Sequence, residues 1–425
     1  MLRLSRLALL LLSVLMLAHA LPRYLDKAFA SDYQSTLVGY SAVMDRFVLS
    51  QVRGGHWSWR DEDGRAMTQE QVRLAMPFEH LDILQRTGRL PGEVAGWPMD
   101  PEEARRLSSR MRLTPRALDR PDPGLYSLLE SEPGPEGLRT PPDLFRMGAT
   151  GMEFIIAATN RVDADKSGRF SAALARAGFE LPARMVADAP GTLKPYDNGV
   201  LLVDRDGRLF HLWQVRGRPR VERTGTRIPG HALSLHVFSQ PRREYHGAYL
   251  LPDAVVLLDW KDHAPQAVPL EGCDFTRQGF AADGDVLNWN FSCQAGNRGP
   301  RQTVATDREL RVLRRHHWEP GSEDRRKQAL HAGVMGALFP FQLQSSSPDR
   351  TQVGLRLRPS QAHPLVTLGG ILAAMLAYVA WHRWRRRRLP RWPDLALVAV
   401  TGWSGAIALA ALGPLHAPRP AVGQG

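Results

Sequence analysis

The chain has 425 residues, of which 43% are hydrophobic, so wholesale disorder is excluded and one large or two ordinary domains are expected beside any membrane segments. Its formal net charge is +12, but arginines in the two terminal segments, offset there only by Asp394, carry most of that excess. The small remainder is spread over residues 22–363, so we expect no single-sign field that would attract nucleic acid.

Residues 1–21 have the layout of an export segment. Arg3 and Arg6 precede an apolar run, and the small-x-small triplet Ala18-His19-Ala20 follows it. As a helix, residues 7–21 would be about 22 Å long, which is short of a hydrocarbon core of about 30 Å. Removal as a signal peptide and retention as a signal anchor are therefore both open.

Residues 22–145 are expected to form a mixed α/β part. The stretch "WSWRDEDGRAMTQEQVRLAM" predicts a strand, a turn and a helix that begins with the capping box Thr68-x-x-Gln71. A second short helix is expected over 80–88. Prolines recur from 114 to 145, which predicts an extended connector or short edge strands at an internal boundary.

Residues 146–363 are expected to be rich in β-meander. Apolar alternation and glycine turns predict strands over 199–204, 208–215, 219–223, 232–239, 246–251, 254–260, 286–292, 302–305 and 351–358, with helices near 169–177 and 322–337. The strands resemble propeller blades but are too few for a closed ring. The predicted fold is therefore an α+β extracytoplasmic domain, β-rich and antiparallel, with transmembrane α-helices at both ends.

The chain has only two cysteines, Cys273 and Cys293. In an oxidising compartment they would form a disulfide, whose loop would contribute about 3 kcal/mol in the chain-entropy model. Two unpaired buried thiols are the alternative. Two cysteines without histidines clustered at ligand spacing do not indicate a zinc site.

Other motifs with metal-binding character are incomplete. The stretch "DADKSG" (163–168) fits the first half of a calcium loop, but Leu174 stands where a bidentate glutamate is needed, so we predict a helix-capping turn. His316 and His317 are chain neighbours, whose side chains point apart in a strand. No nucleotide-binding or catalytic signature is present, so no cofactor or metal is expected. A non-enzymatic role is favoured, while a catalytic Ser/His/Asp set assembled by folding stays open.

Two apolar segments near the other end are long enough to span a bilayer. Leu365 to Trp381 and Leu395 to Leu415 contain no charged residue and correspond to about 26 Å and 31 Å of helix. We expect transmembrane helices over 364–382 and 394–415, followed by a short tail at 416–425.

A loop at 383–393 separates these segments and is expected in the cytoplasm by the positive-inside rule. Tryptophans at its ends fit an aromatic belt better than base stacking. The exported region would then be residues 22–363, on a protein of the bacterial inner membrane. Its topology-setting arginines are Arg383, Arg385, Arg386, Arg387, Arg388 and Arg391.

Small residues recur at every fourth position in both late segments and predict close helix packing. One interpretation is a simple hairpin of the two helices, and the other is that one stripe faces a partner membrane protein. The stripes are Gly369, Ala373 and Ala377 in the first segment and Gly402, Ala406 and Ala410 in the second.

Several stretches, among them "WSWRDEDGRAMTQEQVRLAMPFEHLDILQRTGRLP", "TNRVDADKSGRFSAALARAGFELPA", "KPYDNGVLLVDRDGRLFHL", "REYHGAYLL" and "LFPFQL", resemble an uncharacterised bacterial membrane-anchored family catalogued as domain of unknown function 4857. The resemblance covers most of the exported region. It implies an accessory role beside ABC transporter components and favours a retained N-terminal anchor. It implies no active-site residues.

The leading hypothesis is a non-enzymatic, membrane-anchored envelope protein that is an accessory subunit of an ABC-type transport complex, with the lipid bilayer and a transporter permease as partners. The alternative is an extracytoplasmic ligand-binding sensor or hydrolase. In that case Trp213, Tyr245 and Trp289 would bind sugar or peptide if they are exposed rather than packed in the core.

Overall fold

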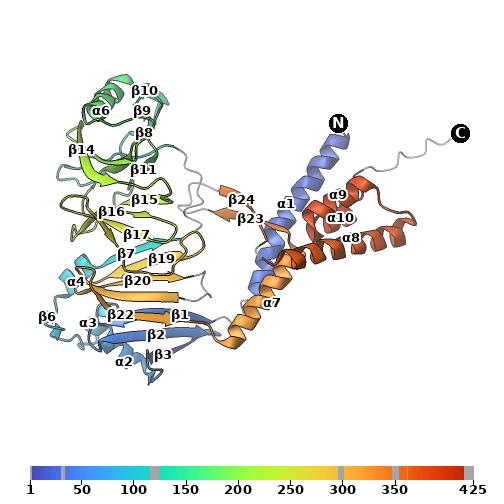
Figure 1. Ribbon diagram of the computed structural model, residues 1–425, viewed down its shortest axis with the longest axis horizontal. Coiled ribbons are helices and arrows are strands. Elements are labelled where there is room, and N and C mark those ends of the chain that lie inside the picture. Colours follow the sequence, from blue (N-terminus) through green and yellow to red (C-terminus); the bar gives the residue numbers. More distant parts are fainter. Residues whose placement is uncertain are drawn as a thin grey trace. The chain divides into compact units, whose positions relative to one another are not determined.

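The computed structural model describes residues 2–29, 34–114, 124–294, 301–346, 354–360 and 362–415. They form two compact units, drawn in Figure 1. The β-rich unit comprises residues 35–51 and 57–319, and the helical unit comprises the N-terminal segment to residue 34, residues 52–56 and residues from 320 onward. The expected tail at 416–425 lies outside the described residues.

Antiparallel sheets build the β-rich unit, and each strand pairs with a near neighbour in the chain, with one exception. The first sheet has the order β1 (Gln34–Ser41), β2 (Arg46–Arg53), β3 (His56–Asp61), β4 (Ala66–Met67). The second is β10 (Arg161–Asp163), β9 (Met152–Ile156), β8 (Asp143–Met147). The third is β11 (Met185–Ala187), β12 (Val200–Val203), β13 (Arg208–Val215), β14 (Arg218–Arg227).

The fourth sheet is β15 (Ser234–Val237), β16 (Tyr245–Leu250), β17 (Val255–Asp259), β18 (Pro265–Ala267). The fifth is β22 (Val312–Trp318), β21 (Arg301–Asp307), β20 (Asn288–Gln294), β19 (Gly279–Gly284), β7 (Ser109–Leu113). Here β7 is the exception, because it is far from β19 in the chain. A two-stranded ribbon, β5 (Glu93–Val94) and β6 (Trp97–Pro98), completes the unit.

Hydrophobic clusters pack each sheet against the next. Leu201, Leu209 and Leu258 belong to one cluster that joins the third and fourth sheets. Further clusters join the second sheet to the third, the fourth to the fifth, and the fifth to the first. Figure 1 shows the sheets following one another along the unit in this order. Burial of apolar side chains on both faces explains why strands such as β12 are entirely apolar.

Four short helices belong to the described part of this unit, and all except α3 begin after a residue whose side chain caps the helix. They are α2 (Gln69–Ala75), α3 (Leu81–Arg86), α4 (Pro101–Leu107) and α6 (Ala164–Arg176). The capping box at Thr68 and Gln71 is formed, and Asp163 caps α6 by accepting a hydrogen bond from the Lys166 N–H. The expected capping role is present at Asp163, but the rest of the "DADKSG" stretch lies inside α6, which begins at Ala164 and not near 169 as expected.

The expected β-rich antiparallel character is confirmed, and the described strands form no closed barrel. The expected proline-rich connector over 114–145 lies in part, at 115–123, outside the described residues. Its described part contributes to the core, because Leu128 and Leu129 are buried and Glu130 forms a bridge to Gln214. Across the expected boundary at 145, β8 pairs with β9. The parts on either side of that boundary therefore share a sheet.

Cys273 and Cys293 lie at disulfide distance, with sulfur atoms 2.01 Å apart. Both are buried in the cluster between the fourth and fifth sheets. The bond would link the segment before β19 to the end of β20.

The helical unit contains α1 (Leu2–Phe29), α7 (Ser322–Leu338), α8 (Pro364–Arg386), α9 (Trp392–Thr401), α10 (Trp403–Leu412) and the ribbon of β23 (Phe341–Ser346) with β24 (Gly354–Pro359). Segments of α1 and α8 are long and apolar enough to cross a membrane. The two helices share a core with α9 and α10, to which Leu10, Val14, Ala374 and Leu409 belong.

The expected single helix over 394–415 is not formed. Gly402 has φ 59° and ψ −138°, a conformation available almost only to glycine, and it divides the segment into α9 and α10. Each has 10 residues, or about 15 Å of helix, which is too short to span a bilayer alone. The sequence did not predict the break at Gly402, because the whole segment 395–415 is free of charged residues.

The end of α10 lies beside the beginning of α9. Leu415, just after α10, donates its N–H to Oδ1 of buried Asp394 in the first turn of α9, at 2.8 Å. Arg6 in α1 donates to the Leu412 carbonyl, and a Cβ added to Gly413 would lie 3.2 Å from Nη2 of Arg386. The beginning of α1, the end of α8 and both ends of the α9–α10 hairpin therefore lie together.

The arginine-rich stretch also differs from the expected loop. Arg383, Arg385 and Arg386 form the last turn of α8, and only Arg387, Arg388 and Arg391 lie between the helices.

Of the small-residue stripes, Gly402 and Ala406 are buried, with Ala410 half-buried. On α8 the buried positions are instead Gly370, Ala374 and Tyr378. Gly369 and Ala373 are exposed and Ala377 is half-buried, so the expected stripe on α8 lies mostly outside the packed face.

Candidate metal and ligand site

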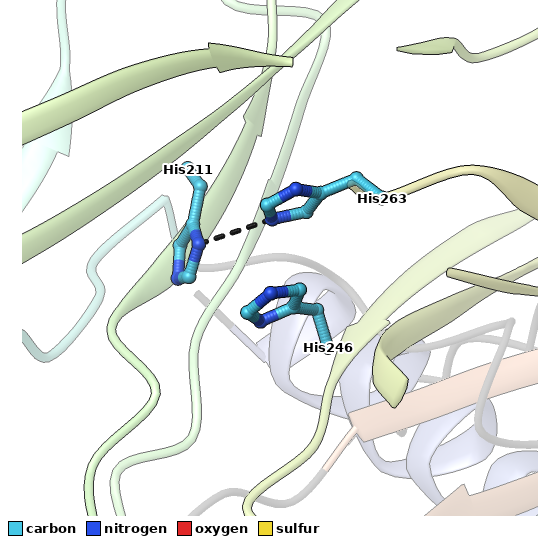
Figure 2. Close-up of side chains that lie close together, drawn as sticks. All are labelled: His211, His246 and His263. Carbon is cyan, nitrogen blue, oxygen red and sulfur yellow. Dashed lines mark hydrogen bonds between the residues drawn. The ribbon is translucent and has the colours of Figure 1, made fainter. Parts of the chain in front are cut away.

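Three histidines from separate segments meet between the third and fourth sheets. His211 lies on β13, His246 on β16, and His263 in the turn between β17 and β18. Packing of the two sheets through their shared cluster brings these segments together. Figure 2 shows the three imidazole rings gathered around one point.

The rings are in mutual contact. His211 Nδ1 and His263 Nε2 are 3.1 Å apart, the dashed line in Figure 2. His246 and His263 are stacked, with ring centroids 4.0 Å apart. One nitrogen from each ring can be chosen so that all three lie within 4.8 Å of one another. All three residues are buried, His263 with 1% of its surface exposed.

Asn198, the residue before Gly199 and β12, fixes two of the three rings. Its backbone carbonyl accepts a hydrogen bond from His211 Nε2 at 2.7 Å. Its side-chain Nδ2 donates to the carbonyls of Phe238 and His246, so its Oδ1 is left to accept from His246 Nδ1, at 3.1 Å. Gly199 has φ 63°, and a Cβ there would lie 2.3 Å from the Leu212 carbonyl oxygen. Only glycine permits this close approach.

These hydrogen bonds determine which nitrogens carry protons. A carbonyl oxygen only accepts, so His211 is protonated on Nε2 and its Nδ1 holds a lone pair. By the same reasoning His246 is protonated on Nδ1 and Nε2 holds its lone pair. His263 Nδ1 is buried and has no hydrogen-bond partner among the described residues.

Burial keeps all three imidazoles neutral. It lowers the pKa of His246 to about 3, with the neighbouring histidines acting in the same direction and a hydrogen bond to the Trp260 backbone opposing them. It lowers the pKa of His263 to about 4 and also depresses the pKa of His211. Neutral imidazole is the form that binds metal ions.

A cavity of about 280 Å³ opens beside two of these rings. Aromatic, acidic and basic side chains line it. It is lined by Ser131, Glu132, Tyr196, Asp197, Asn198, His211, Trp213, Val215, Glu222, Arg243, His246 and Trp260.

Two donors in the cavity wall have no hydrogen-bond partner within the described part of the chain, and of these the Arg243 side chain is exposed while the Tyr196 hydroxyl is buried. The Arg243 guanidinium lies 4.5 Å from the ring centroid of Tyr196 and 5.6 Å from that of Trp260, and it forms no ion pair there. The hydroxyl of Tyr196 is buried without a hydrogen bond. Burial raises the pKa of Tyr196 to about 12, so it remains a hydroxyl donor.

The comparison with known protein families matches residues 37–305 to the family described as domain of unknown function (DUF4857). The chain belongs to the DUF4857 family. No curated protein and no solved structure matches the chain. The matched DUF4857 region includes the three histidines, Asn198 and the whole cavity lining, whereas helices α7 to α10 lie outside it.

Within the DUF4857 region, the aromatic residues expected at a binding site divide between core and cavity. Trp213 lines the cavity, whereas Tyr245 and Trp289 are buried between the fourth and fifth sheets. His317 contacts Glu319, and neither belongs to the histidine cluster.

Sequence spacing did not reveal the cluster. His211, His246 and His263 are 35 and 17 positions apart, far from the short spacings of local metal motifs. The only local sign is the placement of His211 and His246 within otherwise apolar strands, where a buried polar side chain needs partners.

Proposed function

We propose that this DUF4857 protein is a non-enzymatic, membrane-anchored binding protein whose β-rich unit holds a small ligand in the cavity beside His211 and His246. The observation that carries the proposal is the buried Tyr196 hydroxyl, which has no hydrogen-bond partner, beside the exposed guanidinium of Arg243 in the same cavity wall. A buried hydroxyl without a partner costs free energy unless something else accepts its hydrogen bond.

The lining indicates the chemistry of the ligand. A carboxylate suits the guanidinium and the hydroxyl, because both donate hydrogen bonds. Glu132 and Glu222 line the same cavity and have no ion pair in the described part of the chain, so they suit an ammonium group. A volume of about 280 Å³ is at the small end of ligand sites. We therefore propose a free amino acid or a similar small zwitterion.

A thermal-unfolding panel tests this proposal. The full chain, purified in mild detergent, would be heated with each of the standard amino acids and with simple dipeptides. A true ligand at about 100 times its Kd should stabilise the protein by about 2.7 kcal/mol. If no member of the panel raises the unfolding temperature, the proposed ligand class is wrong.

Tyr196→Phe is the matched variant, because it removes one oxygen atom and leaves the ring beneath Arg243. Without ligand its stability should equal or exceed that of the wild type, since a buried unpaired hydroxyl is removed. With ligand its affinity should fall about 10-fold, the equivalent of one charge-assisted hydrogen bond. Equal affinity in the two proteins would exclude Tyr196 from the site.

Membrane anchoring by α1 and α8 is part of this proposal. Both contain segments long and apolar enough to span, and arginines lie at the beginning of α1 and the end of α8. The positive-inside rule then supports a cytoplasmic position for these ends and an extracytoplasmic β-rich unit at the bacterial inner membrane. Retention of α1 is supported by Leu10 and Val14, which are buried against α8 to α10.

A second candidate function, accessory subunit of an ABC-type transport complex, is favoured by the outer face of α8. Gly369 and Ala373 are exposed there, and nothing within the described residues lies near a Cβ added to Gly369. Small residues on an apolar helix allow another membrane helix to approach closely.

Photo-crosslinking in cells tests this second candidate. A crosslinking amino acid at exposed Leu372 should capture a transporter permease, whereas the same group at buried Ala374 should not. Capture of lipid alone at Leu372, together with purification of the protein without any membrane partner, would contradict the accessory role.

A further inference from the structure

We propose that His211, His246 and His263 form a binding site for a divalent transition-metal ion, with Zn²⁺ as the reference ion. This inference goes beyond the proposed function, because the cavity could hold its ligand whether or not the three rings bind a metal. It rests on the separations of the ring nitrogens and on the hydrogen bonds of Asn198.

The separations are close to those of a formed site. Zinc binds imidazole nitrogens at about 2.0–2.1 Å, so two nitrogens in a tetrahedral site are about 3.3 Å apart. The His211 and His263 nitrogens are 3.1 Å apart, and candidate nitrogens of all three rings lie within 4.8 Å. Loading requires the stacked rings of His246 and His263 to tilt, with no rearrangement of strands.

Asn198 supplies the outer hydrogen bonds that histidine ligands of metals use. Such ligands donate their second ring N–H to a carbonyl or carboxylate, which fixes the tautomer and the ring orientation. His211 donates to the Asn198 carbonyl and His246 to the Asn198 side chain. One residue thus places a lone pair on each of two rings, on Nε2 of His246 and on Nδ1 of His211, where it now accepts a hydrogen bond from His263.

His263 is the ring whose tautomer a metal would change. Its Nε2–H can donate only to His211 Nδ1, and its Nδ1 is then a buried lone pair with no donor near it. Moving that proton from Nε2 to Nδ1 frees Nε2 for the metal and leaves the ring neutral. In the present ring position the Nδ1–H would have no acceptor among the described residues, so the tilt of the ring must also bring it to one. The His211 lone pair is freed at the same time, so the three rings together offer three ligand atoms without gaining or losing a proton.

The donor set selects the class of metal. The candidate ligand group consists of three neutral imidazoles, which suit Zn²⁺, Cu²⁺ or Ni²⁺ better than Mg²⁺ and Ca²⁺, which prefer oxygen ligands. Three histidines leave a fourth position open, as in exchangeable zinc sites. His211 and His246 also line the cavity, so a small ligand there could occupy that position.

Metal titration of the purified full chain tests the proposal. The protein would be stripped with a chelator, and Zn²⁺ would be added in competition with a chromophoric chelator. We expect one equivalent bound per chain. His263→Gln should lower the affinity at least 100-fold, while the exposed His231→Gln should bind as the wild type does.

Zinc X-ray absorption of the wild type gives an answer that does not depend on the folding of a variant. It should show three imidazole ligands at about 2.0 Å. Co²⁺ in place of Zn²⁺ should give the intense visible absorption of tetrahedral coordination. Binding that His263→Gln retains, a bound ion with fewer than two imidazoles, or the absence of stoichiometric binding would each overturn the proposal. A loss of amino-acid binding with zinc binding intact would contradict only the proposed function.

Discussion

Replacement of Asn198 by alanine should destabilise the β-rich unit by about 3 kcal/mol. Asn198 is buried, with 5% of its surface exposed, and its side chain makes three hydrogen bonds. They tie the segment before β12 to Phe238 and His246, and therefore the third sheet to the fourth. A typical hydrogen bond contributes about 1 kcal/mol, and buried groups left without partners raise the loss toward about 5 kcal/mol.

Urea unfolding of the full chain in mild detergent measures this loss, with near-ultraviolet circular dichroism reporting on the β-rich unit. Asn290→Ala is the matched control, because the Asn290 side chain makes one hydrogen bond, from Nδ2 to the Val38 carbonyl at 3.1 Å, and its Oδ1 has no partner. The control should lose about 1 kcal/mol. If the two variants lose the same amount, the reasoning about Asn198 at the sheet junction is wrong.

Three further predictions concern the cluster, the cysteines and the membrane helices. Burial lowers the pKa of His263 to about 4 in the folded protein, whereas a histidine in the unfolded chain has a pKa near 6.5. The stability that the neutral ring contributes to the folded state is therefore fully present above pH 6.5 and is lost as the pH falls toward 4. Metal-free protein should lose about 2 kcal/mol through this residue at pH 5, and His263→Gln should show a correspondingly weaker pH dependence in urea titrations. Replacing both Cys273 and Cys293 by serine should cost about 3 kcal/mol and remove the effect of reducing agent on unfolding. Single cysteines at Leu389 and Leu415 should react alike with an impermeant maleimide in intact cells, since the α9–α10 hairpin returns to its starting side, and opposite reactivity would show a third spanning segment.

Local patterns predicted the elements whose contacts are local. The meander from β12 to β14 followed from glycine turns between apolar strands, and α2 followed from the capping box at Thr68. The long apolar segment after the arginines was predicted wrongly as one helix. Its composition is uniformly apolar, and the break depends on a single backbone conformation at Gly402, which a glycine in an apolar run does not announce.

The candidate site could not be predicted from the sequence, because its parts meet only through sheet packing. The residues next to each histidine in the sequence form no known metal-binding motif. The strands that carry His211 and His246 resemble the other buried strands in their apolar composition. Predicting the cluster would have required the stacking order of the third and fourth sheets. That order is set by apolar side chains such as Leu201 and Leu258, which carry no chemical signature of the site.

The hydrogen bonds of Asn198 serve both the fold and the candidate metal site. Asn198 stabilises the junction of two sheets and also sets the protonated nitrogen on two of the three rings, so changing it affects stability and metal affinity together. His263 is different, since its Nδ1 has no partner and its Nε2 bonds only to His211. Loss of zinc binding in a folded His263→Gln protein therefore reports on the site, whereas the same loss after Asn198→Ala reports on the junction and the site at once.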